Sequence, residues 1–368
     1  MVNASPFKYF AALCAITLLL TGCSSERNSD EQWLHSELGS YASAFSPNGK
    51  YVLVGDTDLP AKLWDIEANK IVHSWQNVPE AAGTTTVVGF SGDSKVAATV
   101  EQGGTVSDVS ASFRNEVEIV QQDVIVLWDV ATGEPMIRLS FPVRIRAIAL
   151  SEHGDYLFMA LYDRTAVYFD VIENRVLRIF EHDGKAVNSP INQIINAVAI
   201  SPSGKYGLTG GDDQTARLWE FESGKLLRTW KHGNAVSIVS FYPKGGYVLT
   251  GAGNDQTHFW NMKTGEKRYT LRMSPWPKDR PLPNFPVFQT TISAVDYSPD
   301  YKYMVTGHSS REICLWAVAS GDKQVCWQVA RKNALRPGVV LQAVSFSDDG
   351  RAVYSEAGNG IGQKWILK

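Results

Sequence analysis

Cys23 is the first residue whose side chain could take part in chemistry, because it ends the apolar stretch LLLTGC and the polar residues SSE follow directly. Such a cysteine can be a core residue, a disulfide partner, a nucleophile or a site of covalent modification. Lys8 precedes an apolar run from Tyr9 to Leu20, and no acidic residue occurs before Glu26. The run is too short to cross a bilayer, which needs roughly 20 apolar residues. A basic start and a short apolar run that ends in small residues predict an export signal.

The tetrapeptide LTGC that ends at Cys23 resembles the lipobox of bacterial lipoproteins, in which an aliphatic and two small residues precede the cysteine. The resemblance implies that residues 1–22 are a signal peptide and that Cys23 is diacylated after cleavage. Two or more acyl chains anchor stably, at ~0.8 kcal/mol per buried CH₂. Ser24, rather than Asp, implies sorting to the outer membrane, facing the periplasm. An ordinary signal peptide with an incidental cysteine is the alternative.

The segment SSERNSDE that follows the cysteine contains no hydrophobic residue. It cannot bury enough apolar surface to order itself. We therefore interpret residues 23–31 as the acylated cysteine and a flexible tether, and residues 32–368 as the folded domain. The tether reaches at most about 30 Å, since an extended residue spans roughly 3.5 Å.

The remaining composition argues against several classes of function. The net charge is -3 and no basic stripe is visible, so nucleic-acid binding has no support. Four cysteines in 368 residues do not make a disulfide scaffold. The sequence contains no GxSxG, HExxH or Walker motif, and its seven histidines are scattered without metal-ligand spacing. These patterns predict no catalytic residue, no metal site and no cofactor.

Internal repetition is the strongest signal in the domain. Five stretches align, beginning with AFSPNGKYVLVGD at Ala44 and AISPSGKYGLTGG at Ala199, and two weaker copies fill the gap between them. An aromatic residue anchors each copy, at spacings of 41 to 64 residues that predict seven units. The anchors are Trp64, Trp128, Phe169, Trp219, Trp260, Trp316 and Trp365.

Each unit is expected to contain four short strands. In the fourth copy the strands are predicted at Ala197–Ser201, Tyr206–Thr209, Thr215–Glu220 and Lys225–Trp230, with Gly, Pro, Ser and Asp between them. A four-stranded sheet with two apolar faces cannot stand alone. Arranged radially, each face packs on its neighbour and only short outer edges remain.

The pairs Trp64-Asp65, Trp128-Asp129, Phe169-Asp170 and Trp219-Glu220 resemble the WD-repeat family of β-propellers. The resemblance covers nearly the whole mature chain and implies an all-β, seven-bladed propeller. The Gly-His dipeptide of the family is missing, with only His182 and His232 in suitable places. The last three anchors lack the following Asp, which implies weaker polar bracing of some blades. A quinone-enzyme-type propeller is the rival family, but the repeated Ser-Pro-x-Gly-Lys favours the WD family.

In the WD-repeat family an aspartate in the turn between the second and third strands accepts hydrogen bonds that fix the turn. The resemblance implies this structural role for Asp58, Asp163 and Asp213, each six residues before its anchor. A hard cation held by 212–215 and 254–257 in adjacent copies is the alternative. The spacing of a dedicated calcium loop is absent.

Four insertions exceed the repeat length, at 101–122, 182–193, 272–290 and 331–340. The first joins the second and third strands of a blade, and the others join successive blades, so all four are expected on one face. Insertions on one face of a repeat protein mark its binding face. The third is rich in proline, aromatic and basic residues, which suit a protein contact. We predict partner contacts at Phe113, Arg114, Trp276, Lys278, Arg280, Phe285, Phe288 and Arg336. Alternatively, Trp276 plugs the channel mouth or covers a blade edge.

Two predictions concern pairing of strands. Cys314 and Cys326 flank the 319–322 turn and are expected opposite each other, within bridging distance, in an oxidising compartment. Two buried free thiols are the alternative. The seventh copy holds only three strands, so we predict that Trp33–Leu38 lies antiparallel to Gly362–Leu367 as its outer strand and closes the ring.

Together these features predict a membrane-anchored envelope lipoprotein with a monomeric seven-bladed propeller. It would act as a scaffold for one or more envelope proteins through its loop-rich face. A periplasmic enzyme or small-ligand sensor that uses the propeller channel is the alternative. Converging histidines or acidic groups in that channel would favour the alternative.

Overall fold

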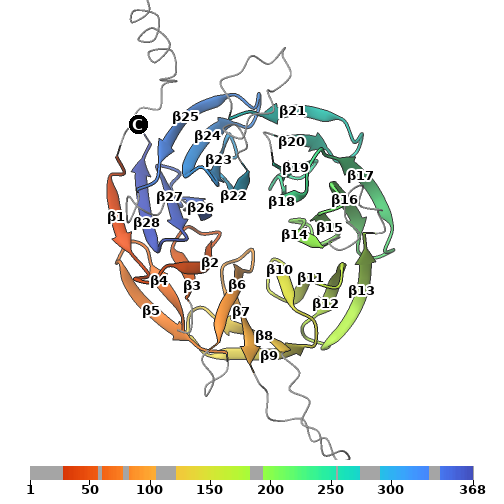
Figure 1. The fold of residues 1–368 in the computed structure, drawn as a ribbon, viewed down its shortest axis with the longest axis horizontal. Coiled ribbons are helices and arrows are strands. Elements are labelled where there is room, and N and C mark those ends of the chain that lie inside the picture. Colours follow the sequence, from red (N-terminus) through yellow and green to blue (C-terminus); the bar gives the residue numbers. More distant parts are fainter. Residues whose placement is uncertain are drawn as a thin grey trace, which may run out of the picture.

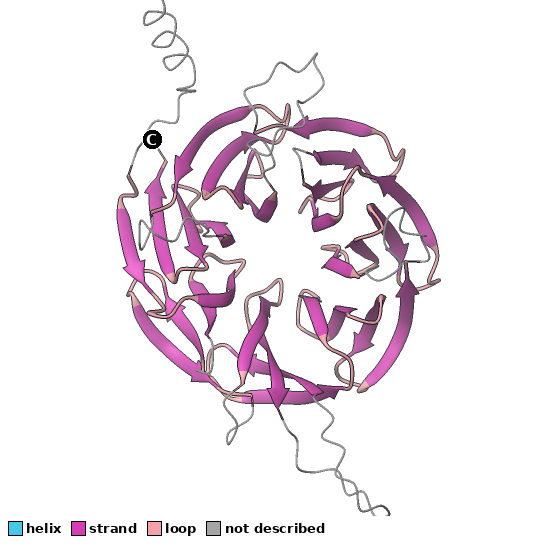
Figure 2. Cartoon of the chain, viewed as in Figure 1, coloured by secondary structure: helices cyan, strands magenta, loops and turns pink. Residues whose placement is uncertain are grey.

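The computed structural model describes residues 28–56, 60–77, 83–104, 122–182, 194–253, 256–273, 291–330 and 340–367. Within these ranges every regular element is a β-strand (Figure 2). The strands form seven four-stranded sheets arranged around a central axis (Figure 1). The predicted all-β, seven-bladed propeller is thereby confirmed.

Blades 1 to 4 each contain four consecutive antiparallel strands, the first nearest the axis and the fourth on the rim (Figure 1). Blades 1 and 2 consist of β2 (Ser40–Phe45), β3 (Tyr51–Asp56), β4 (Ala61–Asp65), β5 (Lys70–Trp75), β6 (Thr84–Phe90), β7 (Val96–Gly104), β8 (Gln122–Asp129) and β9 (Pro135–Phe141). Blades 3 and 4 consist of β10 (Ile145–Leu150), β11 (Tyr156–Leu161), β12 (Thr165–Asp170), β13 (Arg175–Glu181), β14 (Ile195–Ile200), β15 (Tyr206–Gly211), β16 (Thr215–Glu220) and β17 (Leu226–Lys231).

Blades 5 and 6 repeat this order, and blade 7 combines the two ends of the described chain. The strands of blades 5 and 6 are β18 (Val236–Phe241), β19 (Tyr247–Ala252), β20 (Gln256–Asn261), β21 (Lys267–Leu271), β22 (Ile292–Tyr297), β23 (Tyr303–His308), β24 (Glu312–Ala317) and β25 (Lys323–Gln328). Blade 7 consists of β26 (Leu341–Phe346), β27 (Ala352–Ala357), β28 (Ile361–Ile366) and β1 (Glu31–Leu34). Every predicted aromatic anchor lies on the third strand of its blade.

A serine that ends the first strand explains the repeated Ser-Pro-x-Gly pattern. In blade 4, Ser201 Oγ accepts a hydrogen bond from Tyr206 N at 3.0 Å, while Ser201 N donates to the Tyr206 carbonyl at 2.9 Å. Gly204 completes the turn with a positive φ of 69°, which glycine adopts without the steric cost of a side chain. The same serine contact occurs at Ser46, Ser91, Ser151, Ser298 and Ser347.

The core lies between blades rather than inside any one sheet. Between blades 1 and 2, for example, Leu63 and Trp75 pack with Val126 and Trp128 in one buried cluster. An aromatic side chain near the end of an outer strand also packs against the anchor of the next blade. The ring centroids are separated by 5.2 Å for Trp75–Trp128, 5.1 Å for Phe180–Trp219, 5.9 Å for Trp230–Trp260 and 6.1 Å for Trp327–Trp365.

The ring closes as predicted, because β1 is the outer strand of blade 7 and pairs antiparallel with β28. The predicted bounds are wrong, however. Pairing runs from Glu31 opposite Lys364 to Leu34 opposite Ile361. The ladder cannot extend to Leu38, because β28 itself starts at Ile361 and the next amide, of His35, donates to the Gly360 carbonyl in the turn.

The blade also begins earlier than the predicted boundary at residue 32. Asp30 N donates to the Lys364 carbonyl at 2.8 Å, and the Asp30 carboxylate accepts from Ile366 N at 2.7 Å. Ser29 Oγ accepts from Gln363 Nε2 at 2.7 Å. Residues 29–31 are therefore part of blade 7 rather than of the tether, since backbone hydrogen bonds outweigh the local polarity of these residues.

Candidate functional site

The propeller has two faces that differ in the connections they carry. We call the loop face the one with the connections between second and third strands and between successive blades. The turn face carries the connections between first and second strands and between third and fourth strands. The antiparallel topology places the strand ends that flank all four long insertions on the loop face.

Most of the predicted site residues lie outside the described residues. These are Cys23, Asp58, Phe113, Arg114, Trp276, Lys278, Arg280, Phe285, Phe288 and Arg336. Asp163 and Asp213 are described, and both accept hydrogen bonds from the threonine two residues later. Asp163 Oδ1 lies 3.0 Å from Thr165 N and 2.7 Å from its hydroxyl. The two residues are thus seen in the turn position that the family resemblance implies.

Asp213 is the central residue of a buried polar network on the loop side of blade 4. Its Oδ1 lies 3.1 Å from His182 Nδ1, and its Oδ2 accepts from Arg217 at 3.0 Å. His182 Nε2 lies 2.7 Å from Thr209 Oγ1, which also accepts from Trp219 Nε1 at 2.9 Å. Burial acts to raise the pKa of Asp213, but His182 and Thr215 outweigh it and hold the pKa below its usual value. The network therefore braces two blades with an ionised carboxylate.

The hydrogen bond from the anchor tryptophan recurs in four blades. Its donor–acceptor distances are 2.8 Å for Trp128–Thr99, 2.9 Å for Trp219–Thr209, 2.7 Å for Trp260–Thr250 and 2.7 Å for Trp316–Thr306. Sequence reasoning missed these threonines, although three of them stand ten residues before their tryptophan. The predicted weaker bracing after the last anchors is wrong for blade 5, where Asn261 Oδ1 caps the following turn by accepting from Lys263 N and Thr264 N at 2.9 Å. In blade 6 the residue after the anchor is Ala317, which offers no such acceptor.

The turn face opens into a cavity of about 880 Å³ at the mouth of the central channel. First strands and their turns from several blades line it. Among the described residues that line it, none is His, Cys, Lys or Arg. Its carboxylates come from separate blades and are Asp93, Glu152, Asp296 and Asp348. Within this lining the Ser345 hydroxyl contacts Asp296, but no described histidine, cysteine or lysine of the lining joins them.

Two of these carboxylates already have local partners. Burial raises the pKa of Asp296 to about 6, although it accepts hydrogen bonds from Phe346 N at 2.8 Å and the Ser345 hydroxyl at 3.1 Å. Burial opposes ionisation of Asp93, but hydrogen bonds from His153 and Ser91 lower its pKa to about 2. In the described part of the chain no three His, Cys, Asp or Glu residues gather as a metal site would require.

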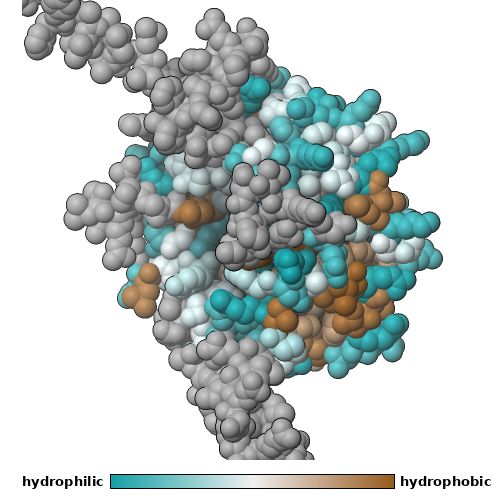
Figure 3. Space-filling model, turned by 45° about the vertical axis from the view of Figure 1, so that its right-hand side comes forward, coloured by the Kyte–Doolittle hydropathy of each residue, from teal (hydrophilic) through white to brown (hydrophobic). Residues whose placement is uncertain are grey.

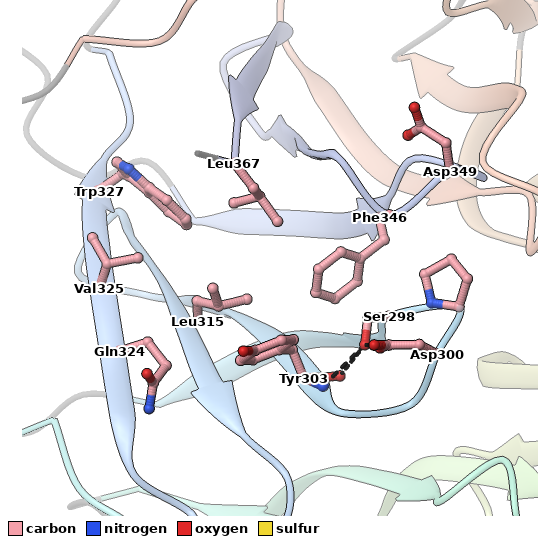
Figure 4. A pocket seen from close by; sticks show the side chains of 12 residues that line it. Ser298, Asp300, Tyr303, Leu315, Gln324, Val325, Trp327, Phe346, Asp349 and Leu367 are labelled. Atoms are coloured by element: carbon pink, nitrogen blue, oxygen red, sulfur yellow. Dashed lines mark hydrogen bonds between the residues drawn. The ribbon is translucent and has the colours of Figure 1, made fainter.

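A second cavity, of about 650 Å³, lies between blades 6 and 7 on the turn face (Figure 4). Apolar side chains form its centre, with Leu315, Phe346 and Leu367 between the two blades (Figure 4). Val325 and Trp327 of β25 form one wall, and Asp300 and Asp349 lie at the opposite end (Figure 4). We call this cavity the 6–7 groove. Sequence reasoning did not identify it.

A family model for the WD domain, G-beta repeat, matches residues 177–220, 224–261 and 281–317. The four-stranded sheet to which these three repeats belong recurs in all seven blades. The chain is a WD-repeat β-propeller. A chain in the crystal structure of the mitotic checkpoint complex superimposes with a TM-score of 0.69, covering 100% of this chain and 99% of that one. At 16% identity this likeness shows the fold alone.

Curated relatives are WD-repeat proteins of eukaryotes. Autophagy-related protein 16 of Arabidopsis thaliana is 25% identical over 294 residues, which cover 78% of this chain and 50% of that protein. GID complex subunit 7 of Schizosaccharomyces pombe is 30% identical over 118 residues, which cover 32% of this chain and 22% of that protein. The WD-repeat propeller thus matches half or less of the length of these two relatives.

The loop face of the WD-repeat propeller carries an exposed apolar patch beside the closing blade. Leu38 is 78% exposed, Tyr41 62% and Val340 50%. Backbone hydrogen bonds hold their segments together, because Ser40 N donates to the Gly358 carbonyl at 3.2 Å and Gly358 N donates to that of Val340 at 3.0 Å. We call Leu38, Tyr41 and Val340 the loop-face patch.

Other apolar side chains gather on the rim of blades 3 and 4, where Figure 3 shows a brown area. Ile172 is 73% exposed, Ile179 58%, Val176 48% and Leu226 45%. Ile179 and Leu226 also line a shallow cavity between these blades. Nothing in its lining points to a particular ligand, so we use this rim only as a reference surface.

The two cysteines of blade 6 stand directly opposite each other on β24 and β25. Their Cα atoms are 4.1 Å apart and a disulfide joins Cys314 to Cys326. Cys314 is fully buried. The structure therefore shows the pairing that the sequence predicts, and thiol labelling tests the oxidation state of the protein.

Proposed function

We propose that this protein is a lipid-anchored lipoprotein of the bacterial envelope that binds other envelope proteins through its loop face. One observation carries the binding role. The strand ends of all four long insertions and the loop-face patch lie on the same face of a WD-repeat propeller. WD-repeat propellers typically serve as protein-interaction scaffolds, and large exposed apolar residues in one patch mark such surfaces.

The anchor rests on the sequence around Cys23 alone. Within the described residues, no helix is long and apolar enough to cross a bilayer. Acylation of Cys23 would supply the attachment instead. The channel lining gives no support to the alternative of an enzyme, because its described residues include no histidine, cysteine, lysine or arginine.

Cross-linking and affinity capture from intact envelopes test the binding role. We would compare the wild-type protein with a loop-face double variant, Leu38→Ser with Tyr41→Ser, and with Ile172→Ser on the rim of blades 3 and 4 as the control. The proposal expects one or more envelope proteins to be cross-linked by the wild type and the control and lost from the loop-face variant. Equal capture by all three proteins would reject the loop face as the binding surface.

Replacement of the cysteine tests the anchor separately. Cys23→Ser should abolish labelling by radioactive palmitate and move the protein from the membrane pellet to the soluble fraction. A variant that still incorporates palmitate and sediments with membranes would show that Cys23 is not the attachment site.

A further inference from the structure

The 6–7 groove exists because blade 7 is built differently from the other blades. In blades 1 to 6 a turn on the turn face links the third strand to the fourth. In blade 7 the fourth strand is β1, from the opposite end of the described chain, so no such turn links β28 to it. The space that this turn covers at other interfaces is open between blades 6 and 7, where it forms the cavity of about 650 Å³.

The other interfaces show what the missing turn contributes. A polar side chain on the outer strand bonds the backbone carbonyls of the next blade's turn. Tyr269 Oη donates to the Val318 carbonyl at 2.7 Å, and Arg178 donates to that of Glu222 at 2.6 Å. His73 Nε2 lies 3.1 Å from the Val130 carbonyl, and Arg228 donates to Lys263.

Blade 6 departs from this pattern at the equivalent position, as blade 2 does with Ile137 opposite Leu127. Val325 pairs with Leu315, as Tyr269 pairs with Phe259 and Arg228 with Leu218. Blade 6 thus has an apolar side chain at the position where four other blades have a polar side chain that contacts a backbone carbonyl of the next blade's turn. Leu367, two residues after its anchor, is half-buried in the groove, whereas the equivalent Phe221 of blade 4 is only 4% exposed. The groove offers apolar contact at the place where a turn would otherwise bind.

The charged groups of the groove all have one sign. Asp300 and Asp349 come from the first turns of adjacent blades, and among the described lining residues none is Lys, Arg or His. Backbone and hydroxyl hydrogen bonds within each turn, led by those from Lys302 N and Ser347 Oγ, lower the pKa of both carboxyls. The exposed Lys302 and Arg351 lie 3.2 and 3.8 Å from these carboxylates. Such exposed pairs contribute little and exchange readily with another cation.

We propose that the 6–7 groove binds an extended peptide segment of a partner protein, with an apolar side chain in the groove and a Lys or Arg beside Asp300 and Asp349. The segment occupies the place of the turn that blade 7 lacks. Apolar burial in the centre supplies affinity, and the two carboxylates select the orientation. This site lies on the face opposite the loop-face patch and does not depend on the lipid anchor.

Fluorescence anisotropy with a defined probe tests the proposal on the purified full-length protein. The probe is a fluorescein-labelled peptide with Arg-Arg-Leu-Phe in a Gly/Ser background, and the control peptide has both arginines replaced by glutamate. We expect saturable binding of the first peptide and binding of the second weakened by about tenfold, since two exposed ion pairs are exchanged for repulsion. Absence of saturable binding, or equal binding of both peptides, would overturn the proposal.

Three variants locate the binding. Val325→Arg introduces the residue found at this strand position in blades 3 and 4, so the fold accommodates it while the side chain fills the groove, and we expect binding to be lost. Asp300→Lys with Asp349→Lys should weaken binding by about tenfold. Glu222→Lys changes the charge of the turn face away from the groove and should leave binding unchanged. If Val325→Arg binds the arginine peptide like the wild type, the groove is not the site. Capture through the loop face should persist in Val325→Arg, which separates this test from that of the proposed function.

Discussion

The polar network of blade 4 makes a quantitative prediction for Thr209→Val. Thr209 is fully buried, and its hydroxyl contacts both His182 and Trp219. Because His182 Nδ1 faces the Asp213 carboxylate, we assign the ring proton to Nδ1, so that Nε2 accepts from the threonine hydroxyl. Valine has the same shape but can neither donate to Nε2 nor accept from the Trp219 indole.

The cost follows from the two buried groups that lose their partner. An unsatisfied buried donor or acceptor costs about 1–3 kcal/mol, so a pair costs about 2–6 kcal/mol before relaxation. Blade 1 shows that the fold tolerates this defect, since Val54 holds the equivalent position and Trp64 Nε1 has no partner among the described residues. We therefore expect the free energy of unfolding to fall by about 2–3 kcal/mol, near the lower end of that range.

Urea unfolding followed by tryptophan fluorescence measures this change, with the free energy extrapolated to water. Thr209→Ser keeps the hydroxyl and should therefore retain most of the stability. Thr229→Val makes the same chemical change on the exposed outer strand of blade 4 and should alter stability by less than about 0.5 kcal/mol. If Thr209→Val unfolds at the same urea concentration as Thr229→Val, the network does not brace the blade.

Three further predictions follow from buried or closing contacts. Because the pKa of Asp296 is raised, the contribution of this side chain to stability is complete below about pH 4 and is lost as the pH rises through about 6. The shift corresponds to ~3 kcal/mol in full, and contact of the side chain with the channel reduces this. The free energy of unfolding of Asp296→Asn should therefore exceed that of the wild type by about 1–2 kcal/mol at pH 8 and match it near pH 4. A difference that does not change with pH would contradict this. Deletion of 31–40 removes β1 and should abolish cooperative thermal unfolding, whereas deletion of 24–27 should not change the melting temperature, and equal melting of both would reject the closure by β1. Thiol labelling of the unreduced, denatured mature protein should find Cys314 and Cys326 unreactive. Reduction should lower the free energy of unfolding by about 2–3 kcal/mol, since the two cysteines are separated by 12 positions in the sequence. Two reactive thiols would show that the disulfide is absent.

The blades could be predicted from the sequence because their determinants are local. The third strand of blade 4 was expected at Thr215–Glu220 and is found there. Each serine turn depends on residues within five positions of one another, as Ser201 and Tyr206 show. Such short-range patterns survive in each copy and can be compared by eye.

Contacts between distant parts of the chain were predicted less well. The closing strand was placed in the correct blade, but its end depends on the Gly360 carbonyl, which is more than 300 residues away in the sequence. The 6–7 groove was missed for a related reason. Val325 is unremarkable by itself, and its meaning emerges only when the outer strands are aligned and the turn of blade 7 is found to be absent.

The interface between blades 7 and 1 differs chemically from its neighbours, and this difference explains how two chain ends close one ring. The first strands of blades 3 to 7 place aliphatic pairs between blades, such as Val236 and Val239. Blade 1 has Ser40 and Ser43 at these positions, and both donate to Gln342 Oε1 of blade 7, at 2.8 and 2.7 Å.

A buried contact between a histidine and a carboxyl group adds to this polar closing interface. Glu356 occupies the strand position held by glycine in four other blades, and its fully buried carboxylate lies 2.8 Å from His35 Nδ1. Burial raises the pKa of Glu356, although His35 opposes this shift. Aliphatic surfaces can slide past one another, whereas buried polar groups must meet their own partners or lose several kcal/mol. We therefore infer that these directional contacts specify where the ring closes, while the apolar interfaces supply most of its stability.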